Sequence, residues 1–177
     1  HVSFLFTSLL TDDCIARGKA LLDGGVRYLG GTNETYGNIN TSDSLWVIRD
    51  LVFNQKKYTL RQLNDAMLAN FNGYEALRKD CLNCDKYGND LETADTMAND
   101  LYEFVAKGVR DIAIGMQYFL IVISNNQLNT EWGNRTAASP DGRLSCMYMN
   151  PANNPQGGAN KSGPTAMLNS LAKFDAK

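Results

Sequence analysis

The 177-residue sequence contains a single histidine, at position 1. Histidine is the side chain that most often serves as a general base near pH 7, so the rest of the chain lacks the usual candidate for acid–base catalysis. No Ser-His-Asp set and no HExxH, Walker or GxGxxG pattern occurs either. The residues taken alone therefore indicate no complete catalytic set.

Excess charge and long hydrophobic runs are also missing. Seventeen basic and nineteen acidic residues give a formal net charge of −2, and Lys and Arg form no cluster, which argues against a nucleic-acid partner. The longest apolar run, 112–123, is interrupted by Gly115 and Gln117 and falls short of the roughly 18 residues that a membrane span requires. We expect neither nucleic acid nor a membrane as a partner.

Cysteine is scarce as well, with four residues in the whole chain. A secreted disulfide scaffold would be shorter and richer in cysteine, and residues 1–10 have neither the basic start nor the cleavage site of a signal peptide. We therefore expect a cytoplasmic location and a buried strand over 1–10. Cys81 and Cys84 have a metal-like spacing, but a second ligand pair is missing, so packing is the favoured interpretation and no metal is expected.

Helical signals occupy most of the chain. Thr59 and Gln62 form a capping box, and Pro164 stands where a helix best tolerates proline. Capping residues followed by apolar residues at helical spacing predict six helices, over 15–22, 45–52 (capped by 41–43), 60–71, 74–84, 93–110 and 165–174.

Strand signals are few. Residues 117–124 are rich in aromatic and β-branched side chains, which predicts a strand buried on both faces, and 144–149 is a second candidate. Residues 26–40 and 150–163 are predicted to be loops. Helices that surround a few central strands favour an α/β fold with parallel strands, here as one segment covering 1–177.

An amide-rich stretch directly follows the strand predicted at 117–124. If the strand continues, Asn125, Gln127 and Asn129 lie on one side of it. Amides at the end of a buried strand can hydrogen-bond a polar ligand, so these three are candidate substrate-binding residues. The alternative is that they satisfy neighbouring backbone groups.

The segment 140–143 (PDGR) has the composition of a tight turn. Proline sets one backbone angle there, and glycine allows a positive φ. Asp141 and Arg143 are expected to brace the loop, with the guanidinium forming bidentate hydrogen bonds.

Six short motifs occur in order along nearly the whole chain. They lie at 13–15 with 24–28 (DCI and GGVRY), 42–45 with 51–53 (SDSL and LVF), 70–78 (NFNGYEALR), 86–90 with 94–95 (KYGND and AD), 136–143 (TAASPDGR) and 156–166 (QGGANKSGPTA). In sequence, order and approximate spacing they resemble the pyruvate formate-lyase family of glycyl radical enzymes.

This resemblance implies a ten-stranded α/β barrel, of which the chain is one helix-rich and incomplete part. In the family, a radical stored on a backbone glycine oxidises a cysteine, and the thiyl radical abstracts hydrogen from a small substrate. Both radical-bearing loops lie outside the matched segment, so we expect no catalytic residue and no bound cofactor here. A separate radical SAM activating enzyme is expected to install the radical. The expected partners are that activase, the remainder of the enzyme, a small-molecule substrate and a second copy in a homodimer.

Three functional hypotheses follow. The first is a segment of a glycyl radical enzyme, a lyase, dehydratase or decarboxylase for a small polar substrate, which is not catalytic alone. The second is a non-catalytic remnant or accessory module that binds a full-length partner. The third is a small-ligand-binding domain that uses the Asn-rich loops.

Overall fold

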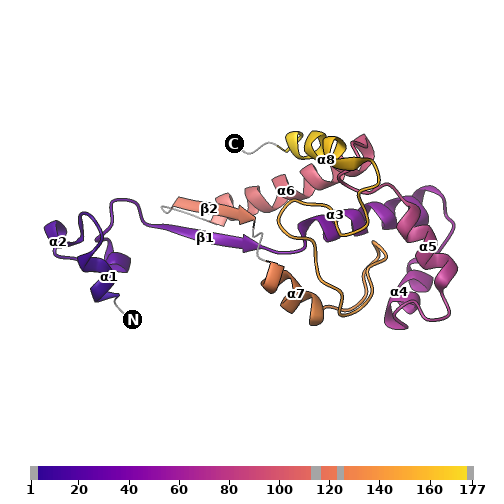
Figure 1. Ribbon diagram of the computed structural model, residues 1–177, viewed down its shortest axis with the longest axis horizontal. Coiled ribbons are helices and arrows are strands. Elements are labelled where there is room, and N and C mark those ends of the chain that lie inside the picture. Colours follow the sequence, from indigo (N-terminus) through magenta and orange to yellow (C-terminus); the bar gives the residue numbers. More distant parts are fainter. Residues whose placement is uncertain (1–3, 113–116, 123–125, 175–177) are drawn as a thin grey trace. The chain divides into compact units, whose positions relative to one another are not determined.

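A computed structural model describes residues 4–112, 117–122 and 126–174 (Figure 1). The chain divides into two compact units. One combines the residues up to Asn33 with Lys107–Ile121, and the other combines Glu34–Ala106 with the residues from Val122 onward. The second unit holds most of the helices and all of the polar network described below.

The described residues of the first unit contain two short helices, a 3₁₀ turn and most of a two-stranded sheet. Strands β1 and β2 pair with each other, and their arrows point the same way in Figure 1, so the pair is parallel as the α/β assignment predicts. The elements are α1 (Leu5–Leu9), α2 (Cys14–Arg17), η1 (Leu21–Asp23), β1 (Gly30–Thr35) and β2 (Gln117–Val122).

Two predictions for the start of the chain are wrong. Residues 5–9 form helix α1 instead of a buried strand, and their apolar side chains are exposed while Ser8 is buried. The helix predicted over 15–22 is only the four-residue α2, because Gly18 adopts a left-handed conformation (φ 59°) and ends it.

In the described part of the second unit, nearly all of the regular secondary structure is helical. Helix α3 continues directly into the π-helix η2, and α6, with 21 residues, is the longest helix of the described residues, as predicted. The last six residues of α6, 107–112, belong to the first unit. The elements are α3 (Asn38–Val47), η2 (Ile48–Asn54), α4 (Leu60–Leu68), α5 (Glu75–Asn83), α6 (Glu92–Ile112), α7 (Asn126–Asn134) and α8 (Gly163–Ala172).

The capping box predicted at the start of α4 is confirmed. The Gln62 backbone N–H donates to Thr59 Oγ1 over 3.2 Å, and the Thr59 N–H donates to Gln62 Oε1 over 2.9 Å. Helices α3, α4 and α5 then bury one apolar cluster with η2 and the turn after α4, formed by Val47, Leu51, Leu63, Ala66, Phe71, Leu77 and Cys81.

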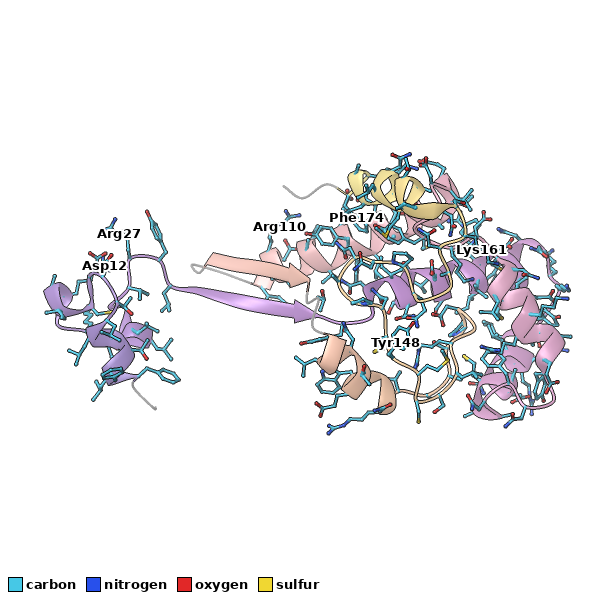
Figure 2. The ribbon with its side chains drawn as sticks, in the orientation of Figure 1. Asp12, Arg27, Arg110, Tyr148, Lys161 and Phe174 are labelled. Atoms are coloured by element: carbon cyan, nitrogen blue, oxygen red, sulfur yellow. The ribbon has the colours of Figure 1, made fainter. Side chains whose placement is uncertain are left out.

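A second, smaller cluster lies beside α6 and α8. Phe174, labelled in Figure 2, follows α8 and packs edge-on against Tyr87 and against Tyr102 of α6, with ring centroids 5.5 Å apart in both pairs. Tyr87 also packs with Ile39 and Ala98. This cluster holds the start of α3 against α6 within the second unit.

Three further predictions need correction. Helix α3 begins at Asn38, directly after Gly37 with φ 70°, so residues 41–43 lie inside the helix instead of capping it. The stretch 26–40 is not all loop, because it contains β1. Residues 144–149 form no strand, because Cys146 has φ 64° and the Met147 N–H bonds back to the Leu144 carbonyl, which turns the backbone.

Within the described residues, no helix is both long enough and apolar enough to cross a membrane.

Candidate functional site

The PDGR segment forms a closed turn in the second unit. The Gly142 N–H donates to the Ser139 carbonyl over 3.0 Å, and Gly142 has φ 92°, the positive angle predicted for it. A Cβ atom at this position would lie 2.7 Å from Leu82 Cδ2, so space as well as conformation selects glycine. The side chains of Asp141 and Arg143, on either side, are both buried.

Arg143 closes the loop in which it lies. Its side chain donates to Ser139 Oγ (3.2 Å) and to the carbonyls of Leu144 (3.2 Å) and Met147 (2.8 Å), and also to the Ala137 carbonyl. Burial lowers the pKa of Arg143 below its usual value. The guanidinium thus organises 137–147 through backbone oxygens and one hydroxyl, where sequence reasoning expected bidentate pairing.

Asn40 connects helix α3 to two distant loops. Its Nδ2 donates to Asp141 Oδ2 (2.8 Å) and to Gln156 Oε1 (3.0 Å). The Asn40 N–H donates to Asn150 Oδ1 (3.1 Å), and the Asn150 N–H donates back to Asn40 Oδ1 (2.8 Å). Both asparagines are buried, and hydrogen bonds are strengthened in such surroundings. Three side-chain partners therefore hold residues 141–156 against the first turn of α3.

Asp43, in the next turn of α3, is a buried carboxyl group that is half satisfied. Its Oδ1 accepts a hydrogen bond from the Tyr87 N–H over 2.9 Å, and its Oδ2 has no hydrogen-bond partner among the described residues. Burial raises the pKa of Asp43 to about 7, against the opposing effects of the Tyr87 hydrogen bond and the nearby Lys86. Asp43 therefore holds a proton over much of the range below neutral pH.

A pocket of about 280 Å³ lies beside Asp43 and Asp141. Its charged lining comes from five of the six motifs that carry the family resemblance. The motifs contribute Asp43 (SDSL), Arg78 (NFNGYEALR), Lys86 (KYGND), Asp141 and Arg143 (PDGR) and Lys161 (QGGANKSGPTA). Segments that lie far apart in the sequence therefore meet at one place in the second unit.

The structure does not bring the three predicted substrate-binding amides together on one strand. Asn125 lies outside the described residues, and Gln127 and Asn129 belong to α7. The strand does not continue past 125, so the expected alternation of side chains along it is wrong. Asn129 is 2% exposed, and neither its Oδ1 nor its Nδ2 has a hydrogen-bond partner among the described residues. Its backbone carbonyl accepts from the Met149 N–H over 3.2 Å, which joins α7 to the loop that Arg143 organises.

Cys81 and Cys84 are part of the packing of the second unit. Cys81 belongs to the main apolar cluster, and Cys84 packs against that cluster. Burial raises the pKa of Cys81 to about 12 and that of Cys84 to about 11, so both stay thiols near neutral pH. In the part of the chain that the structure describes, no three His, Cys, Asp or Glu residues gather in a metal-binding arrangement.

Sequence reasoning from the residues did not single out Asn40, Asp43, Asn150 or Gln156. One signal was present, because asparagine is common in this chain, with 19 residues. A second signal was the run of polar residues at 40–44, which the sequence analysis assigned to the end of a loop and to a helix cap. Their partners lie 44–116 positions away, which a local pattern does not show.

Comparison with known proteins gives a consistent result. The family model described as Pyruvate formate lyase-like matches residues 1–122. The trans-4-hydroxy-L-proline dehydratase of Clostridioides difficile is 33% identical over 178 residues, a match that covers 99% of this chain and 22% of that protein.

Solved structures match equally well. The glycerol-bound B12-independent glycerol dehydratase from Clostridium butyricum superposes with a TM-score of 0.88 at 31% identity, over 96% of this chain and 22% of that one. A glycyl radical enzyme from Archaeoglobus fulgidus gives a TM-score of 0.84 at 30% identity, over the same shares. The chain thus spans about a fifth of the length of the relatives that it matches.

Proposed function

This chain belongs to the pyruvate formate lyase-like family, and from that membership we propose that it is one segment of a glycyl radical enzyme. The enzyme acts as a dehydratase, lyase or decarboxylase on a small polar substrate, and this segment is not catalytic alone. The observation that carries the proposal is the nearly end-to-end match to two dehydratases, one of hydroxyproline and one of glycerol.

Within that enzyme, the segment forms part of the wall of a ten-stranded α/β barrel. The parallel pair β1–β2 supports this role, because two strands alone leave unpaired edges that further strands would complete. The first unit also exposes large apolar side chains, which in a larger barrel would be covered. Leu5, Phe6, Leu9, Leu10, Ile15 and Tyr28 are 63–76% exposed.

The radical chemistry belongs to other parts of the enzyme. A glycyl radical, once installed by a radical SAM activating enzyme, oxidises a cysteine that then removes hydrogen from the substrate. The thiols of Cys81 and Cys84 do not suit that role, because they are packed against or within the apolar core. The contribution of this segment is to hold barrel-wall loops in place through Asn40, Asp141 and Arg143. We also propose that the full-length enzyme is a homodimer.

We propose that the substrate contacts come from this amide-rich stretch, from among Asn125, Gln127 and Asn129. Asn129 gives the most direct support, because its buried amide has two unpartnered atoms among the described residues. Leaving such a group unsatisfied costs about 1–3 kcal/mol, which a polar substrate that bonds to the amide would recover.

The test is turnover by the polypeptide that contains this segment, activated without oxygen by a radical SAM enzyme and assayed with small hydroxylated substrates. We expect turnover by that polypeptide and none by the 177-residue chain alone. Asn129→Ala should raise KM or abolish turnover, whereas Asn134→Ala, at an exposed position of the same helix, should not. Turnover by the isolated chain would overturn the proposal, and an unchanged Asn129→Ala would overturn the substrate role.

A further inference from the structure

The pocket beside Asp43 carries an excess of positive charge. Two arginines and two lysines, Arg78, Lys86, Arg143 and Lys161, line it together with only two carboxyl groups, Asp43 and Asp141. None of the four cations takes part in an ion pair within the part of the chain that the structure describes. Unbalanced cations that converge on one cavity favour an anionic occupant.

Two of these cations are already engaged by the protein. Arg143 donates to four oxygens of its own loop, and Lys86 Nζ donates to the Cys81 carbonyl over 2.5 Å while its side chain is nearly buried. Both contribute positive potential to the pocket, but their bonding geometry is largely committed to backbone oxygens.

The other two cations keep donors available. Arg78 uses Nε to bond the Gly142 carbonyl over 2.9 Å, and its terminal Nη groups have no acceptor among the described residues. Lys161, labelled in Figure 2 in the loop before α8, is exposed, and its ammonium group has no such acceptor either. A guanidinium and an ammonium on one cavity are the usual donors to phosphate, sulfate and carboxylate groups.

Asp43 also lines the pocket. Its Oδ2 is buried and lacks a partner, while its Oδ1 is held by the Tyr87 N–H. Since burial raises the pKa of Asp43 to about 7, this oxygen carries a proton below neutral pH and can then donate a hydrogen bond. An oxyanion would satisfy it, and a cation would instead add to the existing positive charge.

We propose that this pocket binds an oxyanion, the phosphate, sulfate or carboxylate group of a small soluble ligand, between Arg78 and Lys161 and beside the buried carboxyl group of Asp43. The proposal goes beyond the radical enzyme function, because it involves neither the substrate amides near α7 nor the radical. It also explains why charged residues from five sequence motifs meet at one pocket, which the polar network by itself does not explain.

The test is calorimetric titration with inorganic sulfate, at constant ionic strength, of the 177-residue chain and of the longer polypeptide that contains it. We expect saturable binding in both. Lys161→Gln and Arg78→Gln should each weaken it at least about tenfold, the loss expected for one charged hydrogen bond. Arg61→Gln, which removes the same charge from an exposed site on α4, is the matched control and should change little.

Lys161→Gln is the more decisive of the two variants, because Lys161 is exposed and its replacement leaves the fold intact. Arg78, in contrast, also supports the Gly142 turn. Asp43→Asn keeps the acceptor for Tyr87 and removes the titratable carboxylate charge beside the pocket, so it should bind sulfate at least as tightly as the parent protein. The proposal is overturned if sulfate does not saturate, or if Lys161→Gln binds like the control. Binding by the isolated chain that disappears in the longer polypeptide also overturns it, because an acidic side chain of the remainder is then the occupant.

Discussion

Replacing Asn40 with alanine tests the polar network at its centre. The change removes three side-chain hydrogen bonds and leaves two buried groups, Asp141 Oδ2 and the Asn150 N–H, without these partners. Each buried group that loses its partner costs about 1–3 kcal/mol, against roughly 0.5 kcal/mol gained from the higher helix propensity of alanine. We therefore expect the free energy of unfolding to fall by roughly 2–5 kcal/mol.

The assay is urea unfolding followed by tryptophan fluorescence, since both tryptophans, Trp46 and Trp132, belong to the second unit. Asn64→Ala is the matched control, because Asn64 is an exposed asparagine inside helix α4 and gains the same helix propensity. Asn40→Asp should be at least as destabilising as alanine, because it places a second carboxylate against Asp141. An unfolding free energy for Asn40→Ala within about 0.5 kcal/mol of the control would refute the reasoning.

Three further changes probe single features. Gly142→Ala should destabilise by roughly 1–3 kcal/mol, because φ is 92° and the new Cβ meets Leu82, whereas Gly108→Ala, in open space inside α6, should stabilise by about 0.5–1 kcal/mol. Asp43→Asn should stabilise the protein above pH 7. The folded state holds a proton on Asp43 that the unfolded chain releases near pH 4, so parent stability falls between about pH 4 and 7, by at most roughly 4 kcal/mol. Thr59→Ala should cost about 1 kcal/mol by removing the N-cap of α4.

Urea midpoints measure the glycine and threonine changes, and a pH series of the same titration measures the change at Asp43. Equal effects of the two glycine replacements would contradict the account of the PDGR turn. A stability difference for Asp43→Asn that does not grow between pH 4 and 7 would contradict the buried, raised-pKa carboxyl group. A Thr59→Ala protein as stable as its parent would show that the capping box contributes nothing.

Local signals predicted the elements that local chemistry decides. The capping box at Thr59, the long apolar stripe of α6 and the proline at the start of α8 each act within a few residues, and each marks a helix that the structure contains. The strand predicted at 117–124 is present at 117–122, because its aromatic and β-branched residues favour extended backbone.

Non-local contacts account for what the sequence missed. Residues 41–43 look like a capping stretch, but α3 begins earlier and buries Asn40, Ser42, Asp43 and Ser44. Partners for these residues come from Tyr87, Asp141 and Asn150, which lie far away in the sequence. In the segment after 125, the local sequence does not decide the secondary structure. Its amide-rich residues permit either a strand or a helix, and the structure has a helix. The family motifs contain the charged residues that line the pocket, whereas hydrophobic periodicity gave no indication of them.

The measurement that tests the central claim most directly is electron paramagnetic resonance of the polypeptide that contains this segment, after anaerobic treatment with a radical SAM activating enzyme. The account predicts an organic radical signal that depends on the activating enzyme and is lost when the radical-bearing glycine is replaced by alanine. It predicts no signal from the 177-residue chain under the same treatment. A radical on the isolated chain, or none on the activated longer polypeptide, would contradict the assignment.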